Sequence, residues 1–179
     1  MIYLFLANGF EETEGVAPFD ILKRGGIDVQ TVGVGSDLIT ASNGLKIKTD
    51  ITNRDISFEN LKGIVLPGGM PGTTNLENNE DVIKCIDFCA KNKLMIAAIC
   101  AAPSILGKKG LLAGKEACCY PGFEKYLEGA KISNEPVTVC DNIITANGPG
   151  SAMKFGFELV GYLRSQNAVK VLKKGMMYN

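Results

Sequence analysis

Short apolar runs alternate with longer amphipathic stretches along most of the chain. Runs of strand length lie at 2–6, 29–34, 63–66, 94–99, 116–119, 137–140 and 143–146. Apolar positions recur with helical spacing at 13–24, 79–91, 101–109, 151–164 and 167–174. Asn43-Gly44, within 37–50, is a turn signal that predicts a small hairpin. The pattern therefore predicts strands and helices in alternation.

This alternation predicts a single α/β domain over residues 1–179, with a mostly parallel central sheet and helices on both faces. The expected architecture is a flavodoxin-like three-layer α/β/α sandwich with strand order 2-1-3-4-5. In that order the first, third and fourth main strands are neighbours, and ligands bind beyond their carboxyl ends. The segments 9–14, 67–70 and 99–102 are therefore expected to converge on one site.

The composition is that of an ordinary globular protein and argues against several classes of partner. Nineteen basic and nineteen acidic residues give a formal net charge of zero, so no domain-wide field attracts nucleic acid or an anionic membrane. The N-terminal apolar run is too short for a signal peptide or a membrane span. We therefore expect a soluble, cytoplasmic protein with no nucleic-acid or membrane partner.

The chain has six cysteines and no histidine. None of the cysteines has the C-x-x-C spacing of a zinc site, and a metal would have to be held by thiolates and carboxylates alone. We expect no metal and, in a reducing cytoplasm, mostly reduced thiols.

Cys100 follows the most apolar predicted strand and opens a predicted helix. Free amides and the positive end of a helix dipole at that place favour a thiolate, which predicts a lowered thiol pKa. The turn resembles the nucleophile elbow of α/β hydrolases, with a thiol in place of the hydroxyl. The alternative is a small buried hydrophobic residue, but the position at a strand end favours function. Cys118 and Cys119 point to opposite faces if they lie in a strand, so one of them would line the site.

Pro67-Gly68-Gly69 follows the predicted strand at 63–66. Its backbone N–H groups, together with that of Ala101, would form an oxyanion hole. The same tripeptide is also typical of a simple tight turn, so this signal is weak by itself.

Glu11, Glu12 and Glu14 crowd the start of the first predicted helix. The helix dipole accounts for Glu11 and Glu12. Glu14 either serves the same dipole or, if buried with a raised pKa, stays protonated and donates a hydrogen bond to the Cys100 thiolate. Charge alone leaves these two interpretations of Glu14 equal.

Four strings in this order resemble the DJ-1/ThiJ/PfpI superfamily, and its DJ-1-like branch most: GFEETEGVAPFDILKRGGIDV, VLPGGMPG, IAAICAAPSIL and ANGPGSAMKFGFEL. CCYPGFEKYL fits the segment that packs beside the cysteine in this family. The resemblance implies an oxidation-sensitive cysteine at Cys100 and a protonated glutamate at Glu14. It implies a glycine loop at Gly68 and Gly69, beside the Ala101 amide. It also implies a homodimer and no cofactor.

The chain departs from the family pattern at two positions. Tyr120 occupies the place where many relatives have a histidine near the cysteine, and Asn43 the place of a pocket arginine. Because protease-like and amidotransferase-like branches need a cysteine–histidine pair, the chain is not expected to belong to either. Arg24 matches an arginine near the family's pocket and dimer interface, although a cation at a helix C-terminus explains it equally well.

The leading hypothesis is a cofactor-free glyoxalase or deglycase that acts on methylglyoxal, another small aldehyde or an early glycation adduct. Cys100 would add to the aldehyde and Glu14 would move a proton between carbons. The alternative is a redox sensor or chaperone that works through oxidation of Cys100. A third hypothesis, a step in thiazole or thiamine biosynthesis, rests on the naming of relatives alone.

Overall fold

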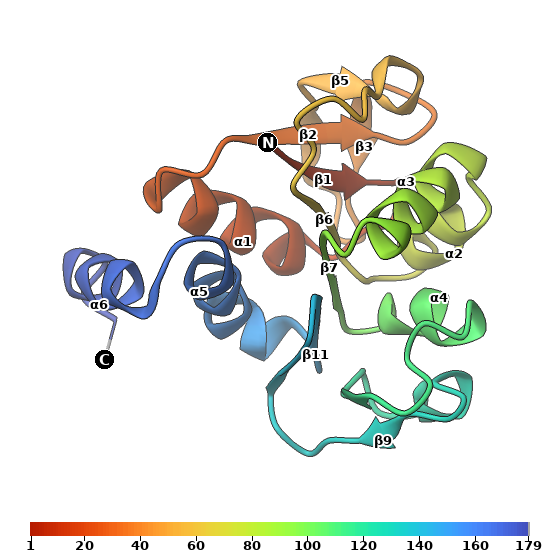
Figure 1. Cartoon of the computed structure of the whole chain (residues 1–179). Coiled ribbons are helices and arrows are strands. Elements are labelled where there is room, and N and C mark those ends of the chain that lie inside the picture. Colours follow the sequence, from red (N-terminus) through yellow and green to blue (C-terminus); the bar gives the residue numbers. More distant parts are fainter. Residues whose placement is uncertain (179) are drawn as a thin grey trace.

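A seven-stranded sheet forms the centre of the molecule (Figure 1). The computed structural model describes residues 1–178. The sheet strands are β1 (Ile2–Leu6), β2 (Val29–Gly33), β5 (Ile51–Thr52), β6 (Gly63–Leu66), β7 (Met95–Ile99), β10 (Val137–Cys140) and β11 (Ile143–Ala146). They lie in the order β10-β11-β7-β6-β1-β2-β5, and only β10–β11 is antiparallel. Between the short edge strands β5 and β10, the five main strands have the predicted order 2-1-3-4-5.

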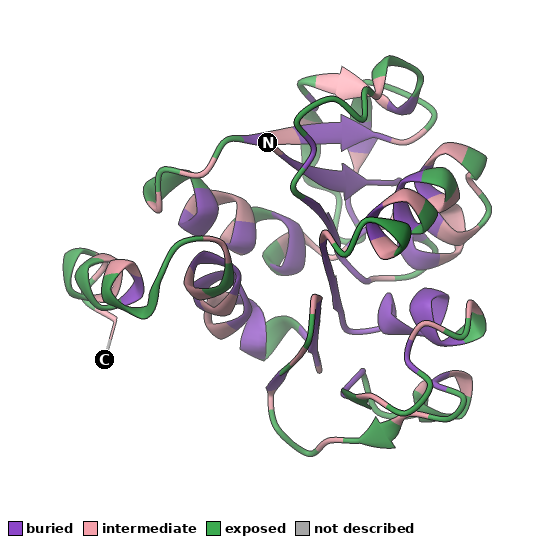
Figure 2. Cartoon of the chain, viewed as in Figure 1, coloured by how far each residue is buried: buried purple, intermediate pink, exposed green. Residues whose placement is uncertain are grey.

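Helices cover both faces of this sheet, so the predicted three-layer α/β/α arrangement is confirmed. One face carries α1 (Glu12–Arg24), α5 (Ala152–Leu163) and α6 (Gln166–Gly175); the other carries α2 (Gly72–Glu77), α3 (Glu80–Lys91) and α4 (Pro103–Lys108) (Figure 1). Successive side chains of a buried strand point to opposite faces of the sheet, and this alternation divides the apolar core into two clusters. Leu4 and Leu6 of β1 pack with the α1–α5 side, whereas Tyr3 and Phe5 pack with the α3–α4 side. Figure 2 shows the resulting buried strands between partly exposed helices.

Two small sheets flank the main one. The hairpin predicted around Asn43-Gly44 is present as antiparallel β3 (Leu38–Thr40) and β4 (Lys46–Lys48). The strand predicted at 116–119 is wrong in its extent: β8 (Glu116–Ala117) pairs in parallel with β9 (Lys131–Ile132) and ends before Cys118. Cys118 and Cys119 therefore do not follow the strand alternation from which their directions were predicted.

The sequence pattern missed the shortest elements, since two to six residues carry too little periodicity to be recognised. These are β5, β9 and α2, together with three short 3-10 helices, η1 (Asn53–Asp55), η2 (Glu124–Tyr126) and η3 (Pro149–Ser151). Helix α4 also begins later than predicted. Pro103 is its first residue, and Cys100, Ala101 and Ala102 form a turn before it. None of the helices formed by residues 1–178 is long and apolar enough to cross a membrane.

Candidate active site around Cys100

The loops that follow β1, β6 and β7 meet at one edge of the sheet, as predicted for three neighbouring parallel strands. Two hydrogen bonds join the first two loops: Glu11 N–H donates to Gly68 O at 3.0 Å, and Gly72 N–H donates to Gly9 O at 3.3 Å. A Cβ on Gly69, which has φ +88°, would lie 2.5 Å from the Glu11 nitrogen. Only glycine allows this close approach of two backbones.

Cys100 lies at the end of β7 with φ 65°, in the left-handed region that few residues other than glycine adopt. Both of its backbone groups are held in place. Its N–H donates to Ala146 O at 2.8 Å, and its carbonyl accepts from Tyr120 N–H at 2.8 Å. The residue is 9% exposed. The turn thus fixes a nearly buried thiol at the sheet edge, which is the sharp strand-to-helix geometry expected from the sequence.

Glu14 is fully buried in the first part of α1. Its Oε2 accepts the Gly68 N–H at 2.9 Å, while its Oε1 has no hydrogen-bond partner among the described residues. Glu14 and Cys100 converge on Gly68. A Cβ on Gly68 would lie 2.7 Å from the Cys100 Cβ and 2.8 Å from Glu14 Oε2. The structure therefore brings a buried carboxyl with one free oxygen next to the thiol.

The electrostatics of this pair differ from the simple helix-dipole prediction. Burial raises the pKa of Glu14 to about 7; contact with Cys100 and the Gly68 amide oppose the rise. Burial also raises the pKa of the Cys100 thiol to about 12, and the neighbouring Glu14 carboxylate adds to the increase. The predicted lowering of the thiol pKa is therefore wrong. Helix α4 begins three residues after Cys100, at Pro103. The amides of Gly69 and Ala101 lower the thiol pKa, but burial and Glu14 outweigh them.

These pKa values have a direct chemical meaning. Two acids in contact inside the protein share protons, and the second proton is much harder to remove than the first. Because burial raises the pKa of both groups, the Glu14–Cys100 pair keeps at least one proton at neutral pH. When the pair holds a single proton, it is a carboxylate beside a thiol if the sulfur carries the proton, and a carboxylic acid beside a thiolate if the carboxyl carries it.

Three backbone amides were expected to form an oxyanion hole, and the structure divides them between two tasks. The Gly68 amide is occupied, because it holds Glu14 Oε2. The amides of Gly69 and Ala101 act on the Cys100 sulfur and make no backbone hydrogen bond within residues 1–178. An oxyanion formed at Cys100 would therefore find two amide donors rather than three.

The remaining predicted pocket residues are scattered. Tyr120 flanks the Cys100 turn: its N–H binds the Cys100 carbonyl, and its half-exposed ring lies against Gly148. Cys119 is buried in the apolar cluster on the α3–α4 side, whereas Cys100 belongs to the cluster on the α1–α5 side. Cys119 therefore packs in a different apolar cluster from Cys100, although its neighbour Tyr120 binds the Cys100 carbonyl.

Arg24 lies at the C-terminal end of α1, ten residues after Glu14, which corresponds to about 15 Å of helix. It forms an exposed ion pair with Asp20 at 2.7 Å. Within one chain Arg24 therefore does not lie beside Glu14 and Cys100, and its place at a dimer interface stays a prediction. The alternative that the sequence allowed, a cation at the end of a helix, describes what the structure shows.

Two residues that support the site were not singled out for that role from the sequence. Glu11 is the N-cap of α1, and its Oε2 accepts the Glu14 N–H at 2.8 Å. Glutamate is not among the residues preferred at an N-cap, so the sequence carried no clear signal for this bond. Ala146, whose carbonyl holds the Cys100 turn, carries no signal in its side chain.

Metal binding has no support in this geometry. Residues 1–178 contain no group of three or more Cys, Asp or Glu side chains that would hold a metal ion. The chemistry that the site offers is that of a thiol, a carboxyl group and amide donors.

Comparison with known proteins places this arrangement in a family. The DJ-1/PfpI family profile matches residues 1–161. The chain belongs to the DJ-1/PfpI family. Protein dj-1beta of Drosophila melanogaster is 30% identical over 177 residues, which are 97% of this chain and 95% of the relative. Glutathione-independent glyoxalase DJR-1.2 of Caenorhabditis elegans is 30% identical over 165 residues, or 92% of this chain and 88% of the relative.

Other members of the DJ-1/PfpI family differ in length or are known as structures. Protein DJ-1 homolog B of Arabidopsis thaliana is 37% identical over 170 residues, but the chain spans only 39% of that protein. The solved structure of Toxoplasma gondii DJ-1, described as oxidized, superposes with a TM-score of 0.94 at 28% identity and covers 99% of this chain and 97% of that one. The predicted superfamily and fold are therefore confirmed.

Proposed function

We propose that this DJ-1/PfpI family member is a cofactor-free glyoxalase or deglycase that acts on small reactive carbonyl compounds, methylglyoxal first among them. The naming of the Caenorhabditis elegans relative as a glutathione-independent glyoxalase supports the reaction class. One observation from the site supports it most. The buried Glu14 carboxyl contacts the Cys100 thiol, has Oε2 fixed by Gly68 and keeps Oε1 without a hydrogen-bond partner among the described residues, which suits a group that moves a proton at a carbon bound to sulfur.

The reaction begins with the single proton of the Glu14–Cys100 pair. The Cys100 sulfur adds to the aldehyde carbon and forms a C–S bond, while the shared proton moves to the aldehyde oxygen. The product is a hemithioacetal, and Glu14 is left as a carboxylate. The amides of Gly69 and Ala101 stabilise the oxygen as its negative charge develops.

Glu14 then acts as a base toward carbon, and the proton that it removes from one carbon is the proton that it delivers to the next. Its Oε1 removes the hydrogen on the former aldehyde carbon, giving an enediol, and delivers it to the adjacent ketone carbon while the hydroxyl proton passes to the ketone oxygen. The aldehyde carbon is oxidised as the ketone carbon is reduced, so no external oxidant or reductant is needed. Water adds to the resulting thioester and the C–S bond breaks. One proton of the water returns to the Glu14–Cys100 pair, the other passes to solvent, and lactate leaves as the anion. A Glu14 pKa of about 7 suits a group that must both accept and release a proton near neutral pH.

The test is a steady-state methylglyoxal assay on the wild type, Cys100→Ser and Glu14→Gln. We expect lactate production to be lost in Cys100→Ser and reduced at least a hundredfold in Glu14→Gln, the usual effect of removing a general acid–base. Cys140→Ser is the matched control, because Cys140 is half-buried at the far edge of the sheet. Wild-type turnover by either site variant would refute the mechanism.

A redox sensor is the second candidate, and the free amides of Gly69 and Ala101 favour it together with the oxidized Toxoplasma gondii DJ-1 structure. These amides and a protonated Glu14 would all donate hydrogen bonds to a sulfinate on Cys100. Dilute peroxide followed by intact-mass measurement tests this candidate. Selective gain of two oxygen atoms, absent in Cys100→Ser, would support sensing, and oxidation spread over several thiols would argue against it.

Homodimerisation is part of the proposal as well. Val16 of α1 and Leu38 and Leu45 of the hairpin region are exposed, and Val16, Phe19 and Ile47 line a cleft of about 280 Å³ beside them. An exposed cleft lined by these apolar side chains favours a protein interface. Light scattering of the wild type and Val16→Asp tests it: a dimer that becomes monomeric is expected, and a monomeric wild type would exclude the dimer.

A further inference from the structure

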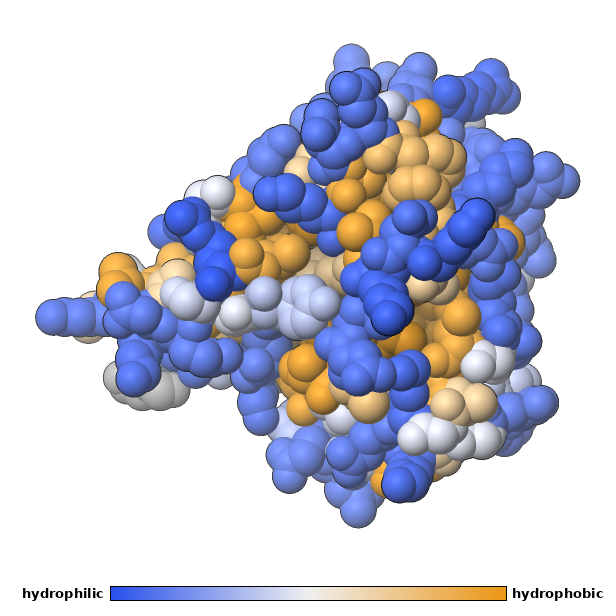
Figure 3. Space-filling model, viewed as in Figure 1, coloured by the Kyte–Doolittle hydropathy of each residue, from blue (hydrophilic) through white to orange (hydrophobic). Residues whose placement is uncertain are grey.

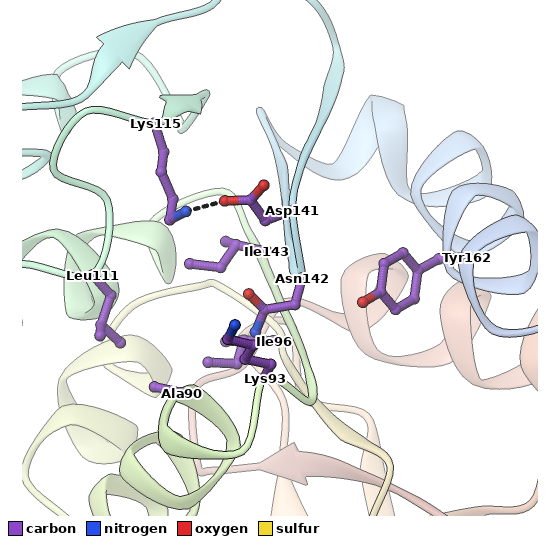
Figure 4. Close-up of a pocket in the computed structure, with 9 residues that line it drawn as sticks. All are labelled: Ala90, Lys93, Ile96, Leu111, Lys115, Asp141, Asn142, Ile143 and Tyr162. Carbon is purple, nitrogen blue, oxygen red and sulfur yellow. Dashed lines mark hydrogen bonds and ion pairs between the residues drawn. The ribbon is translucent and has the colours of Figure 1, made fainter.

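A second cavity lies at the end of the sheet opposite to Cys100. It has a volume of about 540 Å³, within the range of small-molecule sites, and opens where β7 and β11 begin (Figure 4). Ile96 of β7 and Ile143 of β11 are direct neighbours in the sheet and line it. Ile96 precedes Cys100 by four residues of extended chain, about 13 Å, so this cavity is separate from the candidate active site.

The cavity has an apolar part and a polar part. The apolar surface comes from Ala90, Leu111 and Ile143, with Ile96 fully buried behind them, and the polar surface comes from Lys93, Lys115, Asp141, Asn142 and Tyr162. Most of the face seen in Figure 3 is hydrophilic, with apolar patches between the polar groups. A site with both kinds of surface suits a ligand that is itself amphipathic.

The polar groups of the cavity are not equally available. Lys115 is paired with Asp141, and this ion pair raises the pKa of Lys115 and lowers that of Asp141. Asn142 donates its side-chain amide to Leu94 O at 2.6 Å. In contrast, Lys93 forms no ion pair and the Tyr162 hydroxyl makes no hydrogen bond among the described residues. Figure 4 shows the Tyr162 hydroxyl directed toward the other lining residues.

The charges select the class of ligand. Two lysines and one aspartate leave a surplus of one positive charge, which matches a monoanion. Lys93 follows the C-terminus of α3, where the helix dipole is negative, and Asp141 adds a full negative charge nearby. Both disfavour a phosphate dianion, and neither arginine nor a helix N-terminus is present to offset them.

We propose that this cavity binds a small monocarboxylate with an apolar body. Its carboxylate would lie between Lys93 and the Tyr162 hydroxyl, and its hydrocarbon part would pack against Ala90 and Leu111 and the small exposed part of Ile143. The inference is independent of the chemistry proposed for Cys100, because it uses different residues at the other end of β7 and β11.

Titration with 3-phenylpropanoate, followed by amide NMR, tests the site. Shifts are expected at Ile96, Leu111 and Asn142 and not at Cys100. The neutral isostere 3-phenylpropanamide and inorganic phosphate are each expected to bind at least tenfold more weakly, since one charge-assisted contact contributes about 1.4 kcal/mol. Equal binding of the amide, tighter binding of phosphate, or shifts confined to the Cys100 end would each overturn the proposal.

Substitutions of Lys93 test whether its charge binds the ligand carboxylate. Lys93→Met is expected to weaken binding of 3-phenylpropanoate about tenfold, and Lys93→Arg to retain most of the affinity. Lys91→Met is the matched control, because Lys91 is an exposed lysine of the same helix end that does not line the cavity. Ala90→Phe, which fills the apolar part, is expected to abolish binding. Unchanged affinity in both Lys93→Met and Ala90→Phe would exclude this site.

Discussion

Replacement of Gly68 by alanine tests the geometry on which the candidate active site depends. The added Cβ would lie 2.7 Å from the Cys100 Cβ, 2.8 Å from Glu14 Oε2 and 2.8 Å from Ile99 O. All three distances are shorter than a normal van der Waals contact. The φ of Gly68 is not positive, so the backbone conformation itself tolerates alanine and the effect is one of space alone.

The expected magnitude follows from what is able to move. The Ile99 carbonyl and the Cys100 Cβ belong to backbone held by β7 and by the Ala146 carbonyl, so they move little. Glu14 is the softer neighbour, but displacing it breaks its hydrogen bond to the Gly68 amide. Overpacking of this kind costs about 1–3 kcal/mol. A shift of about 1 Å between the carboxyl and the thiol lowers turnover on the order of a hundredfold.

Two measurements check this prediction. Urea unfolding gives the loss of stability, and the methylglyoxal assay together with the rate of Cys100 alkylation by iodoacetamide reports on the site. Gly175→Ala is the control, because no atom lies within 4 Å of its added Cβ and its φ is not positive. We expect that control to keep the stability or raise it by no more than about 1 kcal/mol, because Gly175 is the last residue of α6 and alanine is the better helix former. If Gly68→Ala kept the stability, alkylation rate and turnover of the wild type, the close convergence of Glu14 and Cys100 on Gly68 would be refuted.

Three further predictions concern stability. The pKa of Glu14 is about 7 in the folded protein and near 4.5 in the unfolded chain, so its contribution to stability is complete below pH 4.5 and is lost as the pH rises to about 7. Relative to Glu14→Gln, the free energy of unfolding of the wild type should fall by about 3 kcal/mol over that range in urea titrations. Parallel pH curves of the two proteins would contradict this prediction. Thr145→Val leaves the buried Cys118 N–H without its acceptor and should lower the free energy of unfolding by about 1–3 kcal/mol. Thr138→Val, directly opposite in the neighbouring strand, should be neutral or stabilising because the Thr138 hydroxyl has no partner among the described residues. Equal effects of the two substitutions would argue against this reasoning. Asn79→Ala removes the cap that accepts two amides at the start of α3 and should cost about 1 kcal/mol in thermal unfolding, and no change would show that solvent replaces the cap.

The raised thiol pKa changes how the reactivity of Cys100 is understood. A cysteine activated by a helix dipole alone would be a thiolate before substrate arrives. Here burial and Glu14 keep one proton on the pair, so the reactive form depends on where that proton lies. A substrate oxygen that accepts the proton as sulfur adds would favour the reaction, which agrees with a carbonyl substrate better than with a group that offers no such acceptor.

The order of strands and the place of the site were already contained in the sequence. The apolar runs at 2–6, 63–66 and 143–146 coincide with β1, β6 and β11, and the alternation of strands and helices predicted their parallel order correctly. Period-two and period-3.6 patterns are local, so they survive without knowledge of the fold. The convergence of Glu14, Gly68 and Cys100 on one sheet edge then follows from strand order alone.

Only the tertiary structure decided the protonation of the site and the residues that surround it. The pKa of Cys100 depends on burial and on the Glu14 charge, which are properties of packing, and the sequence argument from a helix terminus gave the wrong direction. Arg24 and Glu14 belong to the same helix, but they lie near its opposite ends. Because β8 ends at Ala117, Cys119 lies outside the strand and packs in the apolar cluster on the α3–α4 side of the sheet. The cavity beside Lys93 is formed by residues from distant parts of the chain, so no local sequence pattern predicts it. Distances between elements, and the charges they bring together, arise only when the chain has folded.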